Sequence, residues 1–193
     1  MATQPLRHAL KEWAAICRAL AEGRQAILLR KGGIAEQTGE FAVEHTRFWL
    51  YPTYVHQQAS GLHPDAADLL RQAETERPPA GVVRISHWAE VAGIYHLHDI
   101  ASALKLQPFH LWSLETVTNR FFYKTPGLYA LSVRVYRSAA VELPETAYYA
   151  GCRSWVELER ELAADDADPV LSDAAFADVR RRLDDVLQPT ALA

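Results

Sequence analysis

The sequence predicts an α+β domain in which a curved, mostly antiparallel sheet or small barrel is flanked by an N-terminal helix and C-terminal helices. Three observations predict this class. Apolar residues recur at helical spacing near the N-terminus, alternating runs fill the middle of the chain, and a second amphipathic stretch lies near its end. We expect one domain over 1–163, with an exposed excursion at 58–82, and an acidic helical appendage over 164–193.

The first predicted elements are an amphipathic helix and a buried strand. The apolar positions of the helix, spaced by three and four residues, are Leu6, Leu10, Trp13, Cys17 and Leu20. Gly23 is placed to end this helix, and we expect Trp13 and Cys17 to be buried in it. The run at 25–30 (QAILLR) then predicts a buried strand.

Short strands and one helix are predicted in the next part of the chain. Two strands are expected at 40–44 and 47–51, with Pro52 closing the second. The excursion contains a short helix that begins near Pro64. Residues 82–97 alternate well enough for one bent strand or two short ones.

Capping residues mark most of the remaining helices. Asp99 and Ser113 are placed to cap helices at 100–106 and 114–120. Between these helices and the tail, 128–137 (LYALSVRVYR) is the clearest strand pattern in the chain.

Two more helices are predicted towards the C-terminus. The segment Ser154-Trp155-Val156-Glu157 has the pattern of a capping box and predicts the start of one helix. The tail at 172–187 predicts another, which is amphipathic.

Composition argues against several classes of protein. The net charge of −4, from 20 basic and 24 acidic residues, is unlike that of a strongly basic nucleic-acid surface. Two cysteines are too few for a Cys-rich zinc site or a disulfide framework. The N-terminus lacks the apolar core of a signal peptide, and no window approaches 18 consecutive apolar residues. We therefore expect a cytoplasmic protein without a membrane partner, a bound metal or a cofactor.

The segment from Arg30 to Gln57 holds the most unusual chemistry. A buried run ends in Arg30-Lys31-Gly32-Gly33, and Glu44-His45 and His56-Gln57 bracket a second run, FWLYPT. Strands that end in polar side chains tend to deliver those groups to one rim of a sheet. The residues expected to line one shared pocket there are Arg30, His45, Tyr51, His56 and Gln57.

Two patterns point to an anionic partner such as nucleic acid or a nucleotide-like ligand. The glycines of RKGG allow a phosphate to approach the backbone, although the Walker spacing is absent and a charged hairpin turn is the alternative. Further along, cations alternate with aromatics, which suits a single strand or an extruded base; an ordinary half-buried strand is the alternative. The predicted contacts are Arg30, Lys31, Gly32, Gly33, His45, Tyr51, Thr53, His56, Gln57, Arg120, Lys124 and Arg134.

Two other functions stay open beside a nucleic-acid-associated binding module. The first is a metal-dependent nuclease or other phosphodiester enzyme, with Glu44, His45 and His56 as catalytic candidates. The Glu-x-Lys pattern of one nuclease class is missing, because neither Glu40 nor Glu44 is followed by a lysine at that spacing. The second is a domain that binds a small ligand or a protein partner without catalysis.

These blocks resemble a known bacterial family. ILLRKGGI, FAVEHTRFWLYPTYVHQ, RFFYK and LYALSVRVYR resemble, in order, blocks of the family called domain of unknown function 1802. The resemblance spans roughly residues 8–160 and implies no activity. The signature positions that it implies are Arg30, Lys31, Gly32, Gly33, His45, Tyr51, Pro52, Thr53, His56 and Gln57.

A weaker resemblance concerns the strand pattern alone. HWAEVAGIYHLHD followed by LYALSVRVYRSAAVELP is similar to the strands of PUA-like barrels, the group that includes ASCH and EVE domains. That resemblance implies a small barrel whose cleft binds RNA or modified bases, an analogy of fold that does not establish function.

Overall fold

Seven strands form one open, curved sheet in the computed structural model, which describes residues 5–31, 45–149, 154–165 and 167–187. The strands are β1 (Leu6–Trp13), β2 (Ile27–Arg30), β3 (Arg47–Thr53), β4 (Val82–Leu97), β5 (Leu128–Pro144), β6 (Trp155–Leu162) and β7 (Asp168–Pro169). Their order is β2-β5-β4-β3-β1-β6, with β7 paired to β5. Every pair is antiparallel except β1 with β3. The predicted fold class is therefore confirmed, as an open sheet.

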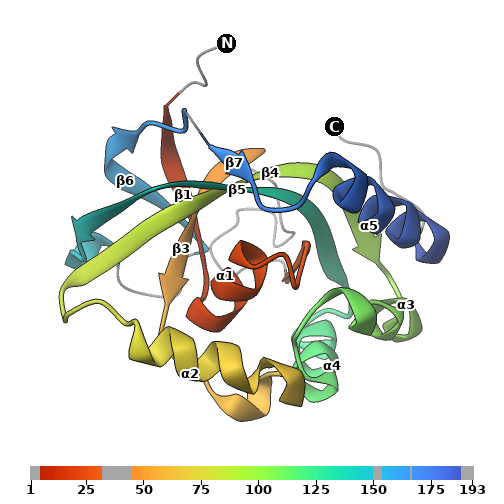
Figure 1. Ribbon diagram of the computed structural model, residues 1–193. Helices are drawn as coiled ribbons and strands as arrows, with labels where there is room; N and C mark the ends of the chain where they lie inside the picture. The colour runs from red at the N-terminus through yellow and green to blue at the C-terminus, as the bar shows by residue number, and fades with distance from the viewer. Residues whose placement is uncertain (1–4, 32–44, 150–153, 166, 188–193) are drawn as a thin grey trace.

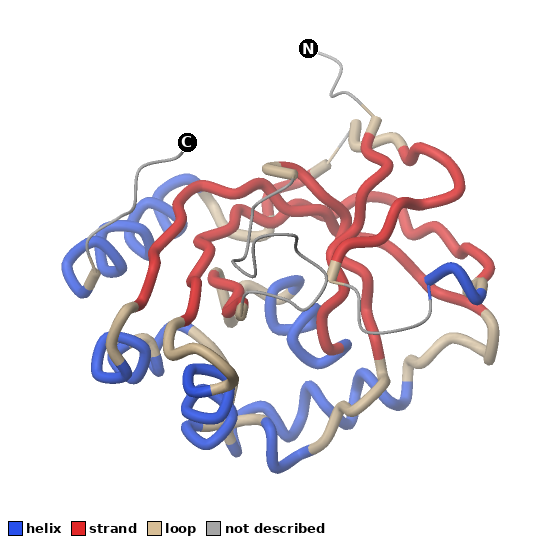
Figure 2. The backbone as a smooth tube through the Cα atoms, turned by 180° about the vertical axis from the view of Figure 1, so that it is seen from behind, coloured by secondary structure: helices blue, strands red, loops and turns tan. Residues whose placement is uncertain are grey.

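Helices cover the sheet mainly from one side. They are α1 (Ala14–Ala21), α2 (Ala67–Thr75), α3 (Ile100–Lys105), α4 (Leu114–Phe122) and α5 (Asp173–Val186). Short 3₁₀ turns occupy Ala59–Gly61, Pro64–Ala66, Gln107–Phe109 and Ala147–Tyr149. Figure 1 shows the sheet arching over α1, with α2 and α4 below it, and Figure 2 shows the same arch from behind.

Three predicted helix starts are confirmed by their caps. The side chains of Asp99, Ser113 and Ser172 each accept a hydrogen bond from a backbone N–H three residues later, at the starts of α3, α4 and α5. Gly23 follows α1 with φ 69°, a conformation that glycine adopts without steric cost. Residues 82–97 form one strand, and the strand predicted at 128–137 continues to Pro144.

The predicted N-terminal helix is wrong in its first half. Residues 6–13 form β1, which pairs in parallel with β3 and antiparallel with β6, and the helix starts only at Ala14. Leu10 and Ala9 are both fully buried although they point to opposite faces of the strand. A strand buried on both faces has no alternation, so local spacing favoured the helix until long-range pairing overrode it.

The capping box predicted at residue 154 is also wrong. Residues 155–162 form β6 at the edge of the sheet, paired with β1. Val156 and Leu158 are buried while Glu157 and Glu159 are exposed, which is the two-residue period of a half-buried strand. The Ser-x-x-Glu spacing therefore has no capping role here.

Two apolar clusters stabilise the domain. The larger one joins α1, α3, α4 and the concave side of the sheet. Leu183 and Leu187, at the end of α5, belong to it, so this helix packs on the domain. The smaller cluster combines residues of β1, β3, β4, β5 and β6 and includes Trp49, Tyr51 and Tyr149.

The sheet opens where β3 and β4 separate. They pair only over Arg47–Trp49 and Trp88–Glu90. Beyond this point β3 stays paired with β1, and the first part of β4 pairs with β5 alone. Pro52 fits this unpaired side of β3, because it has no N–H to offer a neighbour. The predicted second strand at 40–44 lies outside the described residues.

Candidate functional site

The separation of β3 and β4 leaves a cavity of about 400 Å³, which we call the wedge cavity. Its walls come from α1, from α2 and the residues after it, and from the two diverging strands. The apolar part of its lining is Ala14, Cys17, Ala21, Leu50, Pro52, Ala73, Pro78, Val82 and Val83. The polar part is Arg18, Glu22, Tyr54, Glu76, Arg84, Ser86, His87, Arg137 and Glu145. A volume of this size, with an apolar floor and a few polar groups, is typical of a small-molecule site.

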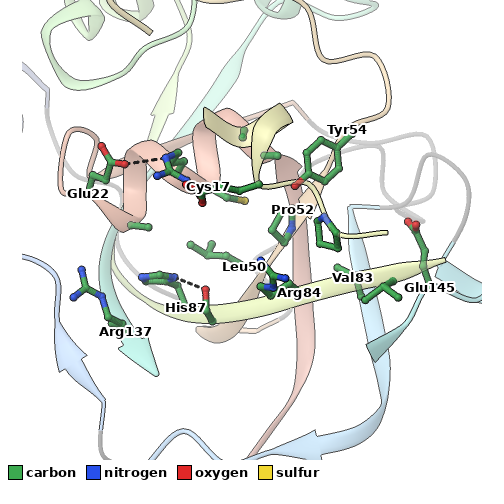
Figure 3. A pocket seen from close by; sticks show the side chains of 18 residues that line it. Cys17, Glu22, Leu50, Pro52, Tyr54, Val83, Arg84, His87, Arg137 and Glu145 are labelled. Carbon is green, nitrogen blue, oxygen red and sulfur yellow. Dashed lines mark hydrogen bonds and ion pairs between the residues drawn. The ribbon is translucent and has the colours of Figure 1, made fainter. Parts of the chain in front are cut away.

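One end of the wedge cavity is cationic. His87 and Arg137 stand opposite each other in the β4–β5 ladder, and both side chains line the cavity (Figure 3). The imidazole Nδ1 shares a hydrogen bond of 2.9 Å with Ser86 Oγ, while Nε2 is buried without a partner among the described residues. Burial, followed by the charge of Arg137, lowers the pKa of His87 to about 4.

The side chain of Arg137 forms no ion pair in the described part of the chain, and it donates no hydrogen bond there. Asp168 faces it across the β5–β7 ladder, but the two side chains form no ion pair. An exposed guanidinium beside a buried imidazole nitrogen can therefore contact an added anion without breaking an existing pair.

The other two arginines of the wedge cavity have carboxylate partners. Arg18 lies 2.9 Å from Glu22 and 2.6 Å from Glu76, so it ties α1 to α2, and hydrogen bonding to Glu76 raises its pKa. Arg84 donates from Nε and Nη2 to one oxygen of Glu142. The positive charge that remains for a ligand is thus concentrated at Arg137.

The opposite end of the cavity offers a hydrogen-bond acceptor and an aromatic ring. Glu145 lines it and accepts a hydrogen bond of 3.3 Å from the hydroxyl of Tyr51. Tyr54 turns its half-buried ring towards the same end (Figure 3), with Arg77 over the ring at 4.5 Å. Burial raises the pKa of the Tyr54 hydroxyl, so this group is a neutral donor at pH 7.

The structure places the predicted site residues in several different surroundings. At the end of β2, Arg30 donates to the Lys11 carbonyl at 2.6 Å and lies 3.8 Å from the buried carboxylate of Glu12. Lys31 donates to the carbonyls of Phe121 and Gly127, at the end of α4. Both basic side chains of RKGG therefore contact protein groups, and Gly32, Gly33 and Glu44 lie outside the described residues.

The histidines and the glutamine of this predicted site have different neighbours. The ring of His45 stacks on that of His8, with centroids 3.5 Å apart, beside Trp155. His56 is exposed, in a turn where its φ is 60°. Gln57 accepts a hydrogen bond from the Ala15 N–H at the start of α1 and donates to Glu74 of α2. Gln57 and Arg30 thus both contact the junction of β1 and α1.

The predicted segment FWLYPT does reach the wedge cavity, but through other side chains than those singled out. Leu50 and Pro52 line it, and so does Tyr54, which directly follows the segment. Tyr51 is fully buried on the opposite face in the smaller apolar cluster, and the hydroxyl of Thr53 accepts from the Val55 N–H. Among the described lining residues, Arg30, His45, Tyr51, His56 and Gln57 are absent from this cavity.

The predicted cations of the C-terminal half have structural partners. The guanidinium of Arg120 lies 3.7 Å from the centre of the Trp112 ring, and burial lowers its pKa. Arg134 forms an ion pair with Asp173 of α5. Lys124 is exposed, with φ 57° and its ammonium 5.6 Å from the Tyr123 ring. Whether any of them contacts nucleic acid stays a prediction.

The polar lining residues Arg84, His87 and Glu145 are among those that were not predicted from the sequence as site residues. His87 follows a register shift between Ile85 and His87, which breaks the alternation of β4 and turns a polar side chain inwards. That break in the pattern of VVRISHW is the signal that points to it. Glu145 has no local signal, since only the pairing of β5 brings it to the cavity.

In the ranges that the structure describes, no group of three or more His, Cys, Asp or Glu side chains is arranged to hold a metal ion. None of the helices within those ranges has the length and apolar character needed to cross a membrane.

Fold and site together define an α+β domain with an open curved sheet and a ligand-sized cavity between two diverging strands. The chain belongs to the family described as domain of unknown function (DUF1802), whose model matches residues 9–182. A comparison with curated proteins gives no significant match.

Solved structures of ASCH proteins from Zymomonas mobilis are similar to this chain. ASCH itself has a TM-score of 0.45 and 11% identity, covering 96% of this chain and 97% of that one. A tyrosine-to-phenylalanine mutant has a TM-score of 0.48 and 13% identity, covering 79% and 90%. These are proteins of the type that the strand pattern resembles, and the similarity says nothing about what this chain binds.

Proposed function

We propose that this domain binds one nucleotide unit in the wedge cavity, either as a free nucleotide or as a residue of a single strand. The observation that supports it most is the pairing of a cationic corner, His87 with Arg137, with an apolar floor in a cavity of about 400 Å³. The phosphate takes the corner and the base takes the floor formed by residues such as Leu50 and Val83. By binding a nucleotide unit of a single strand in this way, the domain would serve as a nucleic-acid-associated binding module.

The cationic corner suits a phosphate for a physical reason. An anion there accepts a charge-assisted hydrogen bond from Arg137, and a turn of the His87 ring adds its Nε2, a buried atom with no partner among the described residues. It also removes the repulsion between the two groups when His87 is protonated. Neither gain requires an existing ion pair to break.

The length of β4 that borders the cavity is compatible with the length of a nucleotide. Val82 and His87 both line the cavity and are five residues apart, which spans roughly 16 Å of extended strand. Long side chains reach inwards from both ends and shorten the span. The LYPT segment contributes to the proposed pocket through Leu50 and Pro52, while a contact from RKGG stays a prediction.

Calorimetric titration tests the proposal with three sets of probes: nucleoside 5′-monophosphates, the matching nucleosides, and short single-stranded oligonucleotides. We expect the monophosphates to bind about tenfold or more tightly than the nucleosides, because a charge-assisted hydrogen bond contributes on the order of 1.5–3 kcal/mol. Tighter binding of oligonucleotides than of monophosphates would identify a strand as the source of the unit.

Arg137→Gln should lower the affinity for monophosphates about tenfold while leaving nucleoside binding unchanged. Arg181→Gln is the matched control, since it removes the same charge from an exposed ion pair on α5. Equal binding of nucleotides and nucleosides, or an Arg137→Gln variant that binds like the wild type, contradicts the proposal. Failure of all three sets of probes to bind also overturns it.

A further inference from the structure

We infer that Glu145, held by Tyr51, selects the base, and that the preferred base is guanine. This inference rests on the proposed function and concerns the end of the wedge cavity opposite Arg137. The lining there is not symmetric: one end is cationic and the other presents a carboxylate (Figure 3). A ligand that satisfies both ends has an anionic group at one end and hydrogen-bond donors at the other.

Glu145 is held in place by two contacts, one at its backbone and one at its carboxylate. Its backbone N–H donates to the Gly81 carbonyl at 2.8 Å, where β4 and β5 meet at their ends. Its Oε1 accepts from the Tyr51 hydroxyl at 3.3 Å, and Tyr51 is fully buried, which leaves its ring little freedom to move. Burial, followed by the charge of Glu145, raises the pKa of Tyr51, so the hydroxyl stays a donor. A carboxylate fixed by a buried donor is pre-organised to accept from a ligand.

Guanine is the base whose donors match a carboxylate. Its N1–H and its exocyclic amino group lie side by side on the Watson–Crick edge, so the two oxygens of one carboxylate can accept from both. Adenine presents an unprotonated N1 at the same place, where a carboxylate repels it. Hypoxanthine keeps the N1–H but lacks the amino group and offers one donor.

A second group near this end favours guanine over the other purine. Arg84 lines the cavity and uses Nε and Nη2 on Glu142, whereas no described contact involves its Nη1. Guanine has an acceptor, O6, beside its N1–H, which suits a guanidinium; adenine has an amino group there. The lining of the cavity thus offers a carboxylate for the donors of guanine and a guanidinium for its acceptor.

The experiment compares the monophosphates of guanosine, inosine and adenosine by calorimetry. We expect affinity to fall in that order, with guanosine about tenfold or more above adenosine. Glu145→Gln should reduce the ratio of the guanosine to the adenosine affinity towards one, because an amide presents one acceptor instead of two. Glu161→Gln, at an exposed position on β6, is the matched control.

Tyr51→Phe tests the positioning role separately from folding. It should lower the ratio of the guanosine to the adenosine affinity severalfold while leaving the affinity for adenosine monophosphate unchanged. A merely structural role of Tyr51 would lower both affinities together. If the wild type binds all three monophosphates equally, or Glu145→Gln keeps the order, the inference about the base is wrong and the proposed function stands. If none of the three binds, the proposed function itself fails.

Discussion

At the scale of single residues, His87 links the site to the acid sensitivity of the fold. Its pKa in the folded protein is about 4, below the ordinary value of 6.5, because burial disfavours the charged form and Arg137 adds repulsion. The unfolded chain therefore takes up a proton at a pH where the folded protein does not. The stability that neutral His87 provides is complete above about pH 6.5 and is lost as the pH falls towards 4.

We predict a flatter pH dependence of stability for His87→Gln than for the wild type. Between pH 7 and pH 4.5 the wild type should lose about 1–2 kcal/mol more of its free energy of unfolding. Urea denaturation across this range measures the difference. His110, whose pKa burial also lowers to about 4, contributes equally to both proteins and does not affect the comparison. Parallel pH profiles would show that His87 is not the group that titrates.

Lys31 has a structural role that can be separated from phosphate binding. Its ammonium donates to the carbonyls of Phe121, Thr125 and Gly127, which satisfies the end of α4. We predict that Lys31→Met lowers the free energy of unfolding by about 1–3 kcal/mol, because three carbonyls lose a charged donor. The exposed Lys124→Met is the control and should be near neutral. Unchanged stability with weakened oligonucleotide binding would instead favour a phosphate contact.

The segment from Leu50 to Tyr54 shows why a site can be predicted to a segment but not to its residues. Polar and aromatic composition pointed to this stretch, and three of its side chains do line the wedge cavity. In a strand, alternate residues face opposite sides, so the choice between Tyr51 and Tyr54 depends on which face is buried. That choice is made by β1 and β6, which are remote in the sequence.

At the scale of elements, three helices that begin at a capping residue were predictable. The strands β1 and β6, near the two ends of the chain, were not. The starts of α3, α4 and α5 follow from Asp99, Ser113 and Ser172, whose hydrogen bonds are local. The strands β1 and β6 pair with each other across some 150 residues. Local spacing cannot report such pairing, and both segments happened to have helix-like patterns.

The packing of α5 on the sheet can be tested at one hydrogen bond. The hydroxyl of Tyr95, on β4, donates to Asp184 of α5 at 2.7 Å. Burial and this carboxylate raise the pKa of Tyr95 to about 12. We predict that Tyr95→Phe lowers the free energy of unfolding by about 1–2 kcal/mol and speeds hydrogen exchange in α5.

The matched control for Tyr95→Phe is Tyr148→Phe. Tyr148 is exposed and its hydroxyl forms no hydrogen bond within the described residues, so this change should leave both stability and exchange as they are. If the two variants behave alike, the bond to Asp184 does not hold α5 on the sheet.

At the scale of the whole molecule, the fold class followed from composition and periodicity, but the cavity did not. The cavity exists because β3 leaves β4 after three paired residues and follows β1 instead. The register shifts in β4 then turn His87 towards the gap. A sequence pattern shows that strands are present, whereas the point at which two of them part is a property of the assembled sheet.

The most direct test of the central claim is a crystal structure of the protein with guanosine monophosphate bound. The phosphate should lie within hydrogen-bond distance of the Arg137 guanidinium and of His87 Nε2, with the base over Leu50 and Val83. Nucleotide density elsewhere, for example at Arg30 and Lys31, or an empty wedge cavity in crystals grown with saturating nucleotide, would contradict the account.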